Sequence, residues 1–179
     1  MSETKKTPRD RAFQFVAALR RACKDGGKSA ALRRGLTDNP RMHVEAYPII
    51  ADLGGEIAQP YIALAALYAT HPQESPVTNF GETCRRTAQD GKDVPDSFNQ
   101  RFRRLIACED VTDVISQLRV WVRFASSKGV GINYENLLAD LLNWPWYADD
   151  IRVKWARSFW KAGEAAADLQ TSVNKTEAP

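Results

Sequence analysis

Apolar residues recur at three- and four-residue intervals along most of the chain, which is the spacing of one face of an α-helix. The pattern is strongest in the second half, where it predicts helices from Pro95, from Asp110 to Ser127, and from Asn133. In the first of these, apolar residues fall at i, i+4, i+7 and i+8 counted from Phe98. The alternating pattern of a half-buried strand does not occur, so the sequence predicts an all-α fold.

The first half predicts shorter helices. Thr7 and Pro8 suit the N-cap and the first helical position, and the pair Gly26-Gly27 is expected to end the helix that they begin. The Ala- and Leu-rich stretch over 56–69 is apolar on all sides, which is typical of a buried helix.

A charged, Gly-containing connection over 90–93 suggests a boundary between two small helical subdomains. We expect an N-terminal helical subdomain over 7–90 and a C-terminal helical bundle over 94–168. A last helix is expected to begin at Asp149 or Asp150, and the polar tail over 170–179 is expected to be disordered.

Composition narrows the class of protein. The chain has 179 residues and a net charge of +3, an excess too small to indicate a polyanionic partner without knowing where the charge lies. Its three cysteines are far apart, which favours free thiols in a reducing compartment. We find neither the apolar core of a signal peptide nor a run long enough to span a bilayer, so a cytoplasmic protein without a membrane partner is expected.

Charge is concentrated on two neighbouring predicted helices. Between Phe98 and Lys128 the sequence has six basic residues and three acidic ones, and the three acids cluster in the connection. Arginine offers a planar fork that matches phosphate oxygens, although any one arginine could simply cover apolar surface with its stem. The candidate nucleic-acid contacts on these helices are Arg101, Arg103, Arg104, Arg119, Arg123 and Lys128, and Arg33 and Arg34 give a weaker form of the same signal.

Sequence motifs for catalysis are not found. Gly26-Gly27-Lys28-Ser29 ends like a phosphate-binding P-loop, but Ala22 stands where that motif requires its first glycine. The two histidines have no second ligand at metal-binding spacing. We therefore predict no catalytic residue, no metal and no cofactor. Trp144, Trp146 and Trp160 are predicted to lie in a protein interface, where aromatic residues are enriched.

Three stretches carry a resemblance to a known family. They are ALRR over 31–34, RFRRLIA over 101–107, and QLR over 117–119. Together with INYENLLADLLNW and VKWARSFW in the C-terminal half, they resemble the small subunit of type I-E CRISPR Cascade, the CasB family. The likeness extends over roughly residues 10–165 and consists of helices and basic positions.

The resemblance implies a non-catalytic, all-helical subunit of an RNA-guided antiviral surveillance complex. It implies that two copies sit head to tail and contact the backbone-forming subunits and the large subunit. The basic groove would stabilise the duplex of guide RNA with target DNA, and also the displaced strand. The nucleic-acid contacts that the resemblance implies are Arg33, Arg34, Arg101 and Arg119.

Two other functions are compatible with the sequence. A helical DNA-binding regulator would use residues 96–128 as a helix-turn-helix pair, but the apolar stripe of the second helix is wide for a helix that reads bases. A purely structural helical adaptor would direct its arginines to acidic protein surfaces.

Overall fold

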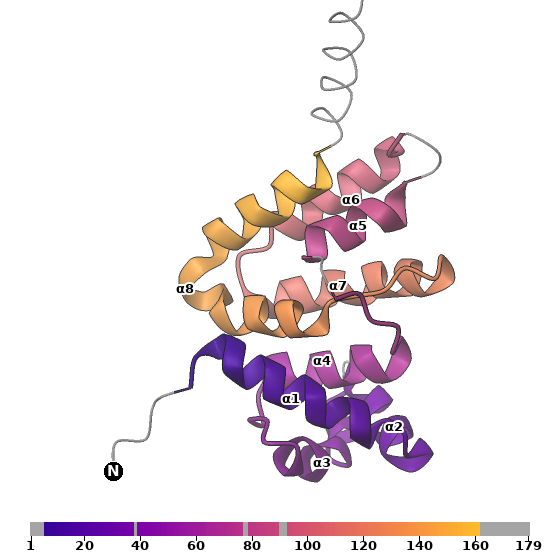
Figure 1. The fold of residues 1–179 in the computed structure, drawn as a ribbon, viewed down its shortest axis with the longest axis vertical. Coiled ribbons are helices and arrows are strands. Elements are labelled where there is room, and N and C mark those ends of the chain that lie inside the picture. The colour runs from indigo at the N-terminus through magenta and orange to yellow at the C-terminus, as the bar shows by residue number, and fades with distance from the viewer. Residues whose placement is uncertain (1–5, 38, 77–78, 90–92, 162–179) are drawn as a thin grey trace, which may run out of the picture.

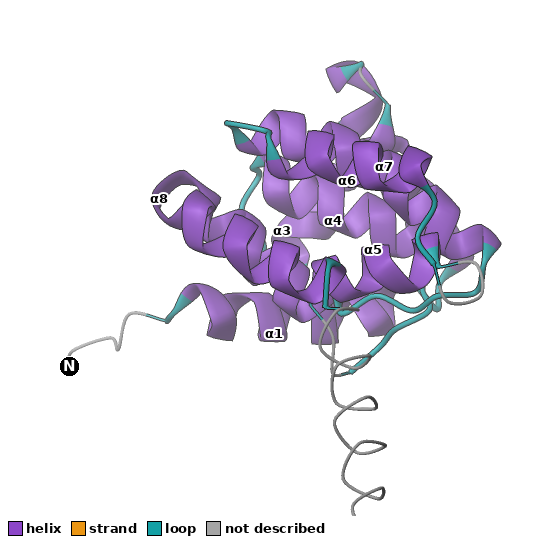
Figure 2. Cartoon of the chain, turned by 90° about the horizontal axis from the view of Figure 1, so that it is seen from above, coloured by secondary structure: helices purple, strands orange, loops and turns teal. Residues whose placement is uncertain are grey.

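The computed structural model describes residues 6–37, 39–76, 79–89 and 93–161 of the chain. Within these residues it contains eight α-helices, two short 3-10 helices and an isolated β-bridge between Glu74 and Ile132. Figure 2 accordingly shows helices joined by loops. The predicted all-α fold is confirmed. The predicted disordered tail over 170–179 lies outside the described residues.

The helices fall into two groups along the chain. The first group is α1 (Pro8–Ala22), α2 (Gly26–Arg33), α3 (Ala46–Asp52) and α4 (Gln59–Thr70), with η1 (Arg34–Leu36) and η2 (Pro40–His43) between α2 and α3. The second group is α5 (Phe80–Ala88), α6 (Asp96–Ile106), α7 (Val111–Ser127) and α8 (Tyr134–Phe159). In Figure 1 the first group lies below the second, and α4 packs against both α7 and α8.

Helix α1 begins as the sequence predicts and ends earlier. The Thr7 hydroxyl accepts from the Asp10 amide, and the Asp10 carboxylate accepts from the Thr7 amide, which forms a capping box. The prediction that Gly26-Gly27 ends this helix is wrong, because the two glycines open α2. Asp25 is the N-cap of α2, and its carboxylate accepts from the Lys28 amide at 2.9 Å.

Helix α4 forms the centre of the molecule. Each of its residues from Tyr61 to Ala69 is buried, which confirms the predicted buried helix. One connected cluster of buried residues draws side chains from all eight α-helices. The division into subdomains at residue 90 stays a prediction, and residues 90–92 of that connection lie outside the described part of the chain.

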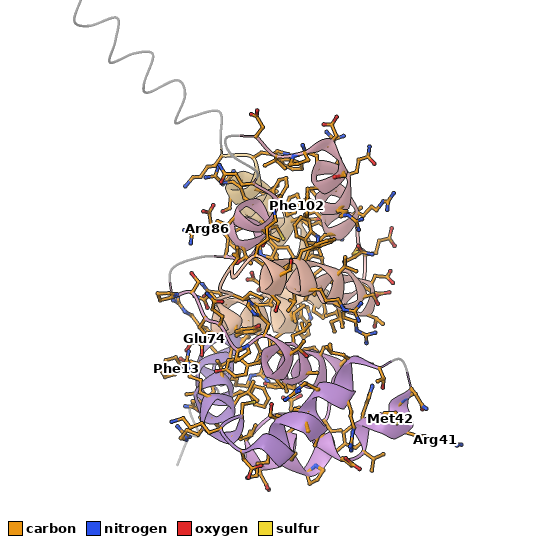
Figure 3. The ribbon with its side chains drawn as sticks, turned by 90° about the vertical axis from the view of Figure 1, so that its right-hand side faces the viewer. Phe13, Arg41, Met42, Glu74, Arg86 and Phe102 are labelled. Carbon is orange, nitrogen blue, oxygen red and sulfur yellow. The ribbon has the colours of Figure 1, made fainter. Side chains whose placement is uncertain are left out.

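A polar network joins the two groups of helices. Arg20 of α1 donates to the Glu74 carboxylate at 2.7 Å and to Glu135 of α8 at 2.7 Å. Tyr68 of α4 also donates to Glu74 at 3.0 Å, and Figure 3 shows Glu74 at the level where the groups meet. The hydrogen bonds from Arg20 lower the pKa of Glu74 and keep it ionised, so the network fixes how the groups pack.

Helix α8 is bent near its middle. Pro145 cannot donate the backbone hydrogen bond of a helix interior, and Tyr147, two residues later, has non-helical dihedral angles of φ −132° and ψ 27°. The new helix expected at Asp149 or Asp150 is therefore the second arm of one bent helix. In Figure 1 the bend is the elbow at the left of the molecule.

Candidate nucleic-acid interface

Helices α6 and α7 direct their cations outward because the opposite, apolar side of each helix packs into the core. On α6, Phe102 and Leu105 are buried, so Arg101, Arg103 and Arg104 face outward. On α7, the buried positions are Val114, Ile115, Leu118, Trp121, Val122 and Ala125.

Both ends of α7 are fixed by the local sequence. The Asp110 carboxylate caps the first turn by accepting from the Asp113 amide at 2.9 Å. At the other end Lys128 is the C-cap, and Gly129 follows with φ of +65°, a conformation that favours glycine. The helix therefore stops in a defined position, with Lys128 exposed beside its last turn.

Two aromatic rings join α6 to α7 beneath the cations. The ring centroids of Phe98 and Phe124 lie 5.2 Å apart in an edge-to-face arrangement. The Arg101 guanidinium lies 5.2 Å from the centroid of Phe124, and the Lys128 ammonium lies 5.8 Å from that of Phe98. Cation–π contacts thus hold one cation from each element over the same ring pair.

Helical geometry decides which other cations join this pair. Arg104 follows Arg101 by three residues and shares its side of α6, whereas Arg103 points about 160° away from Arg101. We call Arg101, Arg104 and Lys128 the cationic edge. On α7, Arg123 lies about 100° from Phe124 and borders this edge, while Arg119 lies about 140° away and is half-buried.

The exposed cations of α6 and α7 share one electrostatic property. No carboxylate within the described residues forms an ion pair with Arg101, Arg103, Arg104, Arg123 or Lys128. Several other arginines of the chain are engaged by its own carboxylates. Arg11 pairs with Glu56 at 2.9 Å and Arg86 with Glu82 at 2.9 Å, for example. The exposed cations of α6 and α7 are therefore available to an external anion.

The first helical group contributes a separate basic site. Arg33 and Arg34 are exposed at the junction of α2 and η1, away from the ring pair of α6 and α7. Arg33 donates to the Ser29 hydroxyl at 3.2 Å, and Arg34 forms an ion pair with Glu45. Phosphate would have to displace the contact with Glu45 to reach Arg34, so the eight predicted residues do not form one evenly available surface.

The exposed Arg41 is not among the candidate contacts that the sequence predicts, and the predicted placement of Trp144 is wrong. Arg41 and Met42 are exposed on η2, next to η1, and Figure 3 shows both projecting from the first helical group. Asn39 starts this turn by accepting from the Arg41 amide, but one turn carries no periodic signal. Trp144 is only 1% exposed, so its predicted place in an interface is wrong, whereas Trp146 and Trp160 are exposed.

Buried ionisable groups belong to the scaffold. Asp140 of α8 accepts from the Trp155 indole at 2.8 Å and from Lys154, and these bonds join the two arms of the bent helix. Burial raises the pKa of the Asp140 carboxyl. Among the described residues no group of three or more potential metal ligands is gathered, and no helix has the length and apolar character to cross a bilayer.

Comparison with known proteins gives a consistent set of relatives. Residues 28–160 match the family model of CRISPR-associated protein Cse2. The CRISPR-associated protein Cse2 of Thermus thermophilus is 27% identical over 150 residues, which cover 80% of this chain and 85% of that protein.

Solved structures share the fold at lower identity. A chain of a CRISPR RNA-guided surveillance complex aligns with a TM-score of 0.75 and 20% identity, over 91% of this chain and 99% of that one. CasB of M. ruber aligns with a TM-score of 0.68 and 24% identity, over 89% of this chain and 97% of that one.

Proposed function

The chain belongs to the CRISPR-associated protein Cse2 family, and we propose that it is a non-catalytic, nucleic-acid-binding subunit of an RNA-guided antiviral surveillance complex. The resemblance to the CasB family is thereby confirmed. Its partners in this proposal are the backbones of guide RNA and target DNA, the backbone-forming and large subunits of the complex, and a second copy of the chain.

One observation carries the proposal: the exposed cations of α6 and α7 have no acidic partner in the described part of the chain. Arg101 and Lys128 lie over Phe124 and Phe98, so part of their side-chain entropy is already lost before they bind an anion. A phosphate backbone lying along the cationic edge would neutralise their mutual repulsion and release condensed counterions.

The mechanism is electrostatic. Base pairing between guide and target reads the sequence, and the protein holds sugar-phosphate backbones without reading bases. Binding of the displaced strand would slow its return to the target strand and so favour the open R-loop. Arg33, Arg34, Arg103 and Arg119 are secondary contacts in this mechanism, since the ion pair of Arg34 and the orientation of Arg103 and Arg119 separate them from the cationic edge.

The proposal is tested in the assembled complex. The tagged full chain is co-expressed with the other subunits of the host complex and a guide, and the purified assembly is expected to contain RNA of one discrete length. The variant R101A/R104A/R123A/K128A should still assemble. Its R-loop, followed by permanganate reactivity of the displaced strand, should close about tenfold faster, which corresponds to about 1.4 kcal/mol.

The matched control removes two arginines that are already paired within the chain. R11A/R86A takes away the partner of Glu56 and one of the two partners of Glu82, and it should leave R-loop lifetime unchanged. An assembly without RNA, or equal lifetimes in the quadruple variant and the wild type, would overturn the proposal. The helical DNA-binding regulator would instead bind one DNA sequence preferentially. The purely structural adaptor would assemble into the complex, and its quadruple variant would leave the R-loop lifetime unchanged.

A further inference from the structure

The bend of α8 exposes two adjacent aromatic side chains. Trp146 is 74% exposed and Tyr147 is 57% exposed, although residues of this kind usually bury most of their surface. They border a hollow of about 610 Å³ in which the polar lining residues include Glu109, Asp149 and Asp150. We call this feature the elbow hollow.

The elbow hollow is built on a rigid frame. Trp144, just before the bend, donates its indole N–H to the Glu109 carbonyl at 3.2 Å. Arg152, just after it, donates to the Cys108 carbonyl, and its guanidinium lies 5.5 Å from the Trp144 ring centroid. The two arms of α8 are thus tied to the connection between α6 and α7, so the backbone that carries the exposed rings is fixed before any partner arrives.

Charge at the elbow hollow is opposite to that of the cationic edge. Asp149 is 94% exposed on its side chain, and Glu109 and Asp150 are exposed as well. Arg152 is the cation that lines the hollow, and it is already engaged with Asp149 at 2.6 Å. The free charge at the hollow is therefore negative, and an aromatic ring beside carboxylates is a favourable environment for a guanidinium or ammonium group.

We infer that the elbow hollow is a docking site for a segment of another protein chain that carries arginine or lysine. The cation would lie over Trp146 and between the carboxylates, and the aliphatic stem would cover Tyr147. This assignment rests on the proposed function, because it takes the partner to be another subunit of the same complex. Exposed aromatic residues on a rigid frame are typical of the residues that dominate binding energy in protein interfaces.

Charge decides against nucleic acid and against two arrangements of a second copy. Nucleic acid would bring phosphates against the unpaired carboxylates of Glu109 and Asp150, which is repulsive. A second copy joined elbow to elbow would set the same carboxylates against each other. A second copy joined elbow to cationic edge would occupy the cations that the proposed function assigns to nucleic acid.

The elbow hollow and the cationic edge lie at opposite ends of α7. Asp110 and Asp113 lie at the end of α7 next to Glu109, whereas Lys128 caps the opposite end. The helix has 17 residues and so separates the two ends by about 25 Å. A protein partner and a nucleic acid can therefore occupy the chain together.

Photo-crosslinking in the assembled complex tests the inference. Trp146 is replaced with p-benzoylphenylalanine in the full chain, and Ile57, an exposed apolar residue of the first helical group, receives the same replacement as a control. Irradiation should join position 146 to another protein subunit, within a few residues of an arginine or lysine, and position 57 should not give this adduct. An adduct to nucleic acid or to a second copy, a site without basic residues, or no adduct would overturn the inference.

Charge reversal gives a second readout. The variant E109K/D150K leaves the ion pair of Arg152 with Asp149 in place and should weaken incorporation of the chain into the complex about tenfold in competition with the wild type. Equal incorporation would contradict the inference. The two proposals fail separately: RNA of one length without the crosslink removes only the docking site, and the crosslink in an assembly without RNA removes only the proposed function.

Discussion

At the scale of single residues, Asp140 shows how an unfavourable charge is accommodated in the scaffold. Its carboxylate is nearly removed from water and is held by the Trp155 indole and the Lys154 ammonium. Replacement by alanine leaves a buried indole N–H without an acceptor, which should destabilise the fold by about 2 kcal/mol. Urea unfolding of Asp140→Ala against the wild type measures this loss.

The same residue predicts a pH dependence. Burial raises the pKa of Asp140, so the folded state binds a proton more tightly than the unfolded state. The stability that this gives is full at low pH and is lost as pH rises through the folded-state pKa. Asp140→Asn cannot ionise and keeps an acceptor for Trp155. Its stability relative to the wild type should therefore rise between pH 3 and pH 7, and a difference that stays flat or falls would contradict this account.

At the scale of elements, the close contact of α5 with α8 depends on one missing side chain. A Cβ on Gly81 would overlap the Trp155 carbonyl oxygen, and a backbone atom inside a helix cannot move aside. Gly81→Ala should separate the two helices and cost about 3 kcal/mol. The matched control is Gly26→Ala, because nothing lies within 4 Å of its Cβ. A thermal melt in which the two variants unfold together would contradict this packing.

Sequence patterns predicted the helices in which an apolar face is clearly separated from a polar one. The apolar stripe of α7, the N-cap at Thr7 and the helix starts at Asp110 and Asn133 could be predicted, because each depends on neighbours a few residues away. The role of Gly26-Gly27 was misread, since a glycine pair can end one helix or begin the next. Asp25 caps α2 and so shows that the glycines begin a helix, but one capping residue is a weaker sequence signal than a glycine pair.

The burial of Trp144 could not be predicted in the same way. Its indole reaches the Glu109 carbonyl, which is 35 residues away in the sequence, so the contact depends on how α8 packs against the connection between α6 and α7. The candidate site likewise has one part that the sequence predicts and one part that depends on tertiary packing. The exposure of the α6 and α7 cations follows from helical spacing, but the contact of Phe98 with Phe124, which joins Arg101 to Lys128, depends on tertiary packing.

At the scale of the whole molecule, the net charge of +3 conceals a separation of charge. Cations gather where α6 meets the C-terminal end of α7, and carboxylates gather at the elbow of α8. The scaffold between them is a single connected core, so the two surfaces keep a fixed relation. A subunit of this kind can hold a polyanion at one surface while a basic protein segment docks at the other.

The central claim is that the exposed cations of α6 and α7 bind phosphates, and the salt dependence of binding tests it most directly. The full chain is titrated with mixed-sequence single-stranded DNA, using fluorescence anisotropy from 50 to 300 mM KCl. Five phosphate contacts predict a slope of log K against log salt of about −3.5. R101A/R104A/R123A/K128A removes four contacts and should make the slope shallower by about 2.8, while R11A/R86A keeps it. A wild-type chain that does not bind, or a folded quadruple variant with unchanged affinity and slope, would contradict the claim.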